Sequence, residues 1–166
     1  MISKPLQDQF EWSISNILTC DDAHVSRVVE SELSIKLDID ESLVKSLAMW
    51  LGKDYGTEEF DCSKCIARID SFERKIRELP KMLLIFAKTT DHDQFPLEMD
   101  LSELMDGSKP AKLSLMGIVY RKSIDKEKVY VSIVRKQDKW IKFVPGAKME
   151  EVEDFKQVKP LLLIYK

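Results

Sequence analysis

The chain has 166 residues, a formal net charge of -3 and a hydrophobic fraction of 44%. Its 26 Lys and Arg residues are scattered among 29 Asp and Glu residues, so there is no basic stripe and no nucleic-acid partner is predicted. The apolar runs are far too short to span a bilayer, so no membrane association is predicted either.

Length and composition predict one domain covering residues 1–166, because no Pro/Gly/Ser-rich linker or low-complexity tract divides the chain. No apolar leader follows Met1. Three cysteines, an odd number without a signal peptide, fit reduced thiols or metal ligands better than a disulfide framework. We therefore expect a cytoplasmic or nuclear protein.

The first half of the chain predicts a hairpin. Residues 9–15 alternate apolar and polar side chains and continue through Ile17 and Leu18, which fits a half-buried strand ending near Cys20. After two aspartates, residues 25–30 and then 32–39 alternate again, which predicts an antiparallel return. The hairpin turn would lie between Cys20 and His24.

A helix is predicted over residues 43–51, where apolar side chains recur at helical spacing behind an Asp N-cap candidate and stop before Gly52. Residues 66–76 fit a strand or a helix equally well, and periodicity leaves both open.

The second half of the chain predicts a sheet. Strands are expected over residues 82–88, 112–121, 128–135, 139–144 and 160–165, with a turn at 91–94, a hairpin tip at 123–127 and a surface loop at 150–154. The fold class is therefore α+β, dominated by strands. Six aromatic residues are predicted to lie in or near the core: Trp12, Trp50, Phe72, Phe86, Trp140 and Phe143.

Six segments in order, at residues 79–88, 95–102, 113–120, 130–135, 140–143 and 161–165, resemble the fingers-and-palm blocks of ubiquitin-specific proteases, which are cysteine-protease deubiquitinases. Upstream, residues 33–39, 42–51 and 60–65 resemble the family's finger strand, its following helix and its second zinc knuckle. The resemblance implies part of a papain-like right hand. Fingers would occupy about residues 8–78 and the palm 79–166, in a single partial domain without the thumb.

The catalytic residues of that family have no counterparts here. Thiol proteolysis needs a nucleophilic Cys, a His and an orienting Asp or Asn. The family's Cys box is missing, Val129 occupies the position of the His, and Phe143-Val144-Pro145 replaces Phe-Asp-Asp. The sequence therefore predicts no catalytic residues. A remaining alternative pairs a knuckle cysteine with His24 as a dyad.

A metal site is predicted from Cys62-Ser63-Lys64-Cys65, because Cys-x-x-Cys places two thiolates on one tight turn, as tetrahedral zinc requires. The resemblance implies a first knuckle at Cys20, where the second Cys is lost and His24 follows instead. Cys20, His24, Cys62 and Cys65 would then hold a structural zinc ion, and no other cofactor is predicted. The alternative is a degenerate finger with reduced, metal-free thiols.

Three functions follow from these residues. The preferred one is a catalytically inactive member of the ubiquitin and deubiquitination system whose fingers and palm bind ubiquitin or a partner protein complex. The second is part of an active thiol deubiquitinase, or ubiquitin carboxyl-terminal hydrolase, whose thumb lies elsewhere. The third is a structural scaffold that does not contact ubiquitin.

Overall fold

A computed structural model describes residues 8–39, 42–52, 62, 64–65, 69–89, 95–124, 126–155 and 157–166. Within these residues the chain is an α+β fold dominated by strands, as the sequence predicts. The elements are β1 (Trp12–Cys20), β2 (Val25–Glu32), β3 (Ile35–Ile39), α2 (Leu43–Leu51), β4 (Ile69–Glu78), β5 (Leu83–Thr89), β6 (Glu98–Asp100), the 3-10 helix η2 (Ser102–Leu104), β7 (Lys112–Ile124), β8 (Glu127–Lys136), β9 (Lys139–Phe143), β10 (Glu150–Val152) and β11 (Pro160–Tyr165).

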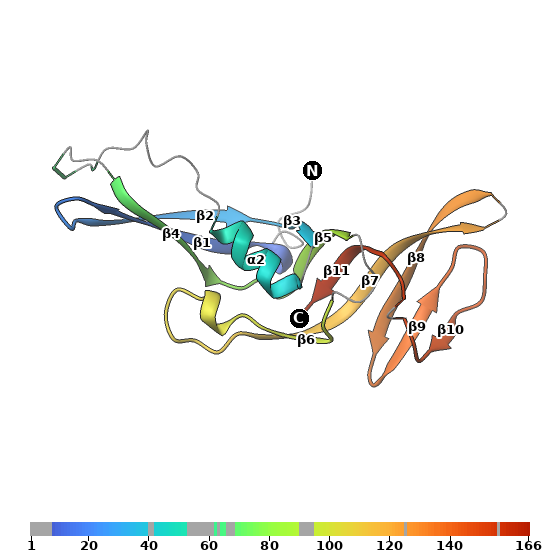
Figure 1. Ribbon diagram of the computed structural model, residues 1–166. Coiled ribbons are helices and arrows are strands. Elements are labelled where there is room, and N and C mark those ends of the chain that lie inside the picture. The colour runs from blue at the N-terminus through green and yellow to red at the C-terminus, as the bar shows by residue number, and fades with distance from the viewer. Residues whose placement is uncertain are drawn as a thin grey trace.

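A three-stranded sheet in the order β2-β1-β4 extends as an arm from the rest of the molecule (Figure 1). β1 pairs with β2 and with β4, and both pairs are antiparallel, so the predicted hairpin is confirmed. The segment whose periodicity fitted a strand or a helix is a strand, β4, over its described residues. The first strand begins later than predicted. The carbonyl of Gln9 accepts a hydrogen bond from the amide of Met82 at 2.9 Å, which ties this residue to the start of β5 and not to the β1 ladder.

The predicted return strand is wrong in its second part. Residues 32–39 do not continue along β1, because the return ends at Glu32 and β3 joins a second sheet, where it runs parallel to β5. Ile35, Leu37 and Ile39 alternate as predicted and are all buried. Alternation shows which side chains are buried but not which strand lies alongside. The division into fingers at 8–78 and palm at 79–166 stays a prediction.

Helix α2 forms where predicted, but its N-terminal cap is a different residue. Ser42 has an extended backbone, and its hydroxyl oxygen accepts a hydrogen bond from the Lys45 amide at 3.2 Å. This satisfies one of the free amides of the first turn. Asp40, the predicted cap, lies outside the described residues. At the other end, the Gly52 amide donates to the Ala48 carbonyl at 2.9 Å.

The second sheet has eight strands in the order β10-β9-β8-β7-β11-β5-β3, with β6 paired to β7 off this path. The five strands predicted in this half are all present. The 150–154 segment is not only a loop, since β10 pairs with β9. Its acidic side chains face Lys139 and Lys142, which form ion pairs with Glu151 and Glu150. The predicted turn at 91–94 lies outside the described residues.

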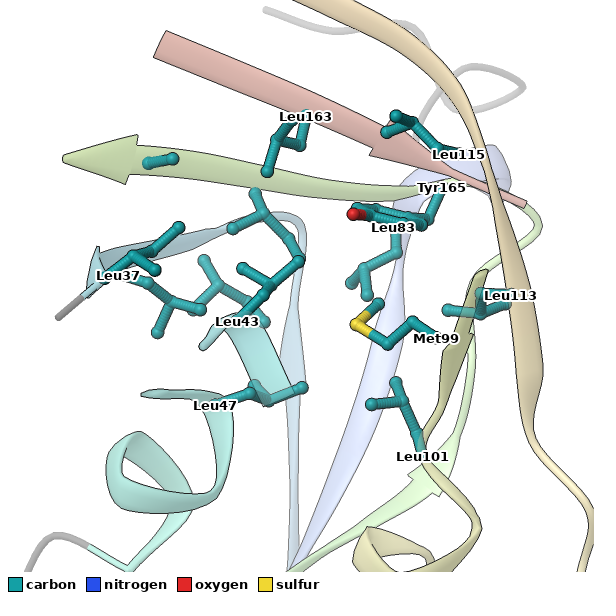
Figure 2. Close-up of a cluster of buried hydrophobic side chains, with 14 of the residues drawn as sticks. Leu37, Leu43, Leu47, Leu83, Met99, Leu101, Leu113, Leu115, Leu163 and Tyr165 are labelled. Atoms are coloured by element: carbon teal, nitrogen blue, oxygen red, sulfur yellow. The ribbon is translucent and has the colours of Figure 1, made fainter. Parts of the chain in front are cut away.

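The hydrophobic core lies between α2 and one face of the eight-stranded sheet. Figure 2 shows Leu83, Leu163 and Tyr165 of the sheet pointing toward Leu43 and Leu47 of the helix. All five side chains are almost fully buried. The core continues into the base of the arm through Trp12, Ile14 and Ile76. No helix in the described part of the chain is long and apolar enough to cross a bilayer.

The predicted aromatic core is confirmed only in part. Trp12 is buried and stacks on Trp50, with ring centroids 5.9 Å apart, and Trp140 packs against the same core. Phe86 and Phe143 are 44% and 37% exposed, so their prediction as core residues is wrong. Both lie on the face of the eight-stranded sheet away from α2.

Candidate metal centre

The four predicted metal ligands come together at the far end of the arm. Cys20 is the last residue of β1, and His24 immediately precedes β2. Cys62 and Cys65 lie just before β4, which is hydrogen-bonded to β1. Because β1 pairs with both β2 and β4, the sheet itself brings the two sequence-distant pairs to one place (Figure 1).

A tight turn positions the first pair. The Cys20 amide donates to the His24 carbonyl at 3.1 Å, and the Ala23 amide donates to the Cys20 carbonyl at 2.8 Å. Ala23 has a φ of 59°, in the left-handed region that is unfavourable for a residue with a Cβ atom. Asp21 and Asp22 are exposed turn residues here, not ligands of the cluster.

The side chains of this cluster converge. One potential ligand atom from each of Cys20, His24, Cys62 and Cys65 lies within 4.8 Å of the others. The Cys20 and Cys65 sulfurs are 3.5 Å apart, and the Cys62 sulfur is 4.0 Å from Nδ1 of His24. Cys20 and Cys62 are buried together with Ile69, so the cluster lies in a small apolar environment of its own, separate from the main core.

This arrangement fits tetrahedral zinc. Zn–S bonds of about 2.3 Å and Zn–N bonds of about 2.0 Å place neighbouring ligand atoms roughly 3.5–3.8 Å apart around the metal. The Cys20–Cys65 sulfur separation of 3.5 Å lies at this spacing, and the 4.0 Å between the Cys62 sulfur and Nδ1 of His24 is slightly wider. Three thiols and one imidazole also form a common structural zinc set. The residues present could therefore hold a metal ion.

The local backbone favours the thiolate that metal binding requires. The Lys64 amide donates a hydrogen bond to the Cys62 sulfur, and the amide of Cys65 and the thiols of Cys65 and Cys20 add to it. These donors outweigh the opposing effect of burial and lower the pKa of Cys62 to about 6.

We expect the metal-free chain to show a thiolate that titrates near pH 6, followed by absorbance at 240 nm and absent in Cys62→Ser. Because this pKa is depressed by folding, the thiolate contributes stability above the pKa of an unfolded thiol, about 8.5. That contribution is lost as the pH falls through about 6. A single titration near the unfolded value in the folded chain would contradict this assignment.

Two valines occupy the positions that the sequence resemblance aligns with a catalytic His and Asp. Val129 lies on β8 and Val144 follows β9; both are half-buried and pack against the main core. The alternative dyad would pair the Cys62 sulfur with His24, which lie close together. Among the described residues of the cluster, however, the other neighbours are thiols, which suit metal coordination and not the orienting of an imidazole.

Sequence reasoning missed a groove in the arm between the metal cluster and α2. The groove encloses about 370 Å³ and is lined by Asn16, Leu18, Val28, Glu30, Glu32, Phe72 and Arg74. Arg74 is buried in its floor, donates to the side-chain oxygen of Asn16 at 3.0 Å and to Glu30 at 3.3 Å, and lies 4.8 Å over the Trp50 ring. The position of Arg74 between Phe72 and Ile76, in alternation with them, could have indicated that its side chain faces the same side of the strand. Its charge, however, suggested an exposed position.

Comparison with known proteins adds a likeness of fold. No protein-family model and no curated protein matches the sequence. A chain of the SAGA DUB module of Ubp8, Sgf11, Sus1 and Sgf73 bound to monoubiquitin matches with a TM-score of 0.77 and 19% identity, over 95% of this chain and 40% of that chain. The same module bound to ubiquitin aldehyde matches with a TM-score of 0.74 and 19% identity, over 95% and 41%.

A yeast SAGA DUB module carrying an Sgf73 mutant also matches, with a TM-score of 0.72 and 20% identity, over 95% of this chain and 41% of that chain. This chain thus spans about two fifths of the length of the chains that it matches. At these identities the likeness establishes the fold.

Proposed function

We propose that this chain is a ubiquitin-specific-protease-like protein that is catalytically inactive by itself and binds ubiquitin or a partner protein of the deubiquitination system. The observation that carries this proposal is the likeness of fold over 95% of the chain to proteins in ubiquitin-bound DUB modules. Valines at positions 129 and 144, packed against the core where proton transfer would need polar groups, support the inactive assignment. The chain would represent fingers and palm.

The metal would be a structural zinc ion held by Cys20, His24, Cys62 and Cys65. A closed set of four protein ligands leaves no open position for substrate, which is the arrangement of structural and not catalytic sites. Its role would be to hold the β1–β2 turn against the start of β4. Reduced thiols of this kind suit the cytoplasm or nucleus.

The groove in the arm is the surface that we assign to ubiquitin. Its walls combine the apolar side chains of Leu18, Val28 and Phe72 with the carboxylates of Glu30 and Glu32. Such a surface suits an apolar patch bordered by basic side chains. The floor is rigid, because Arg74 is held by hydrogen bonds and by the ring of Trp50. Rigid floors reduce the ordering cost of binding.

Replacing Val28 with Arg is expected to weaken ubiquitin binding at least about tenfold, because a charge would enter the apolar wall of the groove. The experiment is a titration of isotope-labelled monoubiquitin with the chain, followed by amide shifts. The matched control is Val29→Arg: Val28 and Val29 are 48% and 45% exposed on the same strand, but only Val28 lines the groove. Alternating side chains place them on opposite faces of the arm.

Equal weakening by both variants would remove the groove from this role. An absence of shifts with the unmodified chain at high concentration would overturn ubiquitin binding and favour the scaffold. Hydrolysis of a ubiquitin–fluorophore ester by the isolated chain, abolished by replacing one cysteine, would overturn the inactive assignment.

A further inference from the structure

The eight-stranded sheet has a second apolar face on the side away from α2. The strand registers place two rows of side chains across it, which we call the open face. One row contains Leu84, Ile164, Gly117, Val134 and Ile141, and the other contains Phe86, Leu162, Val119, Ser132 and Phe143. Each row crosses β5, β11, β7, β8 and β9, and only Ser132 is polar.

The open face is not part of the core. On the opposite face of the same strands, Ile85, Leu163, Ile118 and Ile133 are at most 1% exposed and belong to the main core. The larger apolar members of the open face are half-buried or exposed, and none of them belongs to that core or packs against it among the described residues. Phe86 and Phe143 therefore present their rings at a surface.

Two neighbouring strands of the open face, β5 and β11, have the sequence of a sheet buried on both sides. The segments 82–87 and 161–165 are unbroken apolar runs. Strands of a sheet that has one solvent-exposed face instead alternate apolar and polar side chains. Contiguous apolar surface of this kind marks an interaction site. At the end of the open face formed by β3 and β5 lies a groove of about 310 Å³, lined in part by Lys36 and Phe86, which has room for an inserted side chain.

The charges around the open face are mostly basic. Lys88 pairs with Asp38 and Lys139 with Glu151, at 3.4 and 2.7 Å. Lys36, Arg121 and Lys136 are also exposed around this face, and no ion pair joins them to another described residue. The unbalanced charge at the rim is therefore positive, which favours a partner with carboxylates at matching positions.

We propose that the open face binds a helical segment of a partner protein, with an apolar stripe flanked by acidic side chains. Sheet faces in two-layer proteins are covered by helices or by another sheet. The charged rim on both sides of a narrow apolar band suits the single stripe of an amphipathic helix. This surface is separate from the groove in the arm and does not depend on ubiquitin binding.

The test uses a synthetic helical peptide of roughly 18 residues, about five turns, with a leucine stripe flanked by Glu, and a twin with Lys in place of Glu. Titrated into the isotope-labelled full chain, the Glu peptide is expected to shift amides of β5, β7, β8 and β11. The Lys peptide should bind at least about tenfold more weakly.

Phe86→Ser should weaken binding of the Glu peptide at least about tenfold. Met49→Ser, which removes an exposed apolar side chain of α2, should leave binding unchanged. Equal binding of both peptides, shifts confined to the arm, or no binding would each overturn the proposal. Concentration-dependent dimerisation that Phe86→Ser abolishes would assign the open face to a second copy of the chain and would also overturn it.

Discussion

Replacing Cys62 with Ser is expected to release the proposed zinc ion and to lower the free energy of unfolding by about 3 kcal/mol or more, a part of the roughly 10 kcal/mol that zinc contributes in small zinc domains. The loss is partial because the main core, which reaches only the base of the arm, does not include the metal cluster. For a chain of this size such a loss lowers the melting temperature by about 6–12 °C. The measurements are metal content per chain by elemental analysis and thermal unfolding.

Asp21→Ser is the control for this variant, because Asp21 lies in the turn between Cys20 and His24, is exposed, and is not among the clustered ligands. It should retain the metal and melt close to the unmodified chain. Removal of the metal with a chelator should reproduce the effect of Cys62→Ser and add nothing to it. If the purified chain carries no zinc and Cys62→Ser melts unchanged, the degenerate-finger alternative is correct.

Replacing Trp12 with Ala is expected to destabilise the chain by about 3–5 kcal/mol, the usual range for removing a buried Trp or Phe side chain. Trp12 is 2% exposed, stacks on Trp50 of α2 and joins the base of the arm to the main core. Its removal should therefore separate the arm from the helix as well as create a cavity. Chemical denaturation followed by tryptophan fluorescence and by circular dichroism measures the change.

Trp12→Phe separates the packing effect from any polar contribution. No described group accepts a hydrogen bond from the Trp12 indole nitrogen, so a Phe ring loses volume but no such bond. We expect the Phe variant to lose less than half of what the Ala variant loses, because much of the stacking surface remains. Equal losses for the two variants would mean that the indole has a polar role that the packing does not reveal.

Much of the candidate site could be predicted because its residues have few other uses. Cys-x-x-Cys has a specific geometric meaning, and the chain has only three cysteines and two histidines, so the candidate ligand set was small. The groove could not be predicted in the same way. Arg74 is charged and lies in a segment whose periodicity was ambiguous, and its burial depends on Asn16 and Trp50, which are far away in the sequence.

The sequence by itself determined the strand-rich class, the helix at 43–51 and the Cys62–Cys65 pair, because side-chain periodicity and ligand spacing are local properties, whereas Cys20 and His24 were added by the family resemblance. Only the tertiary structure decided that β3 leaves the hairpin to pair with β5, and that Phe86 and Phe143 lie outside the core. Strand pairing and solvent exposure depend on which segments meet across the fold. An apolar strand has the same sequence whether its second face is covered by its own chain or by a partner.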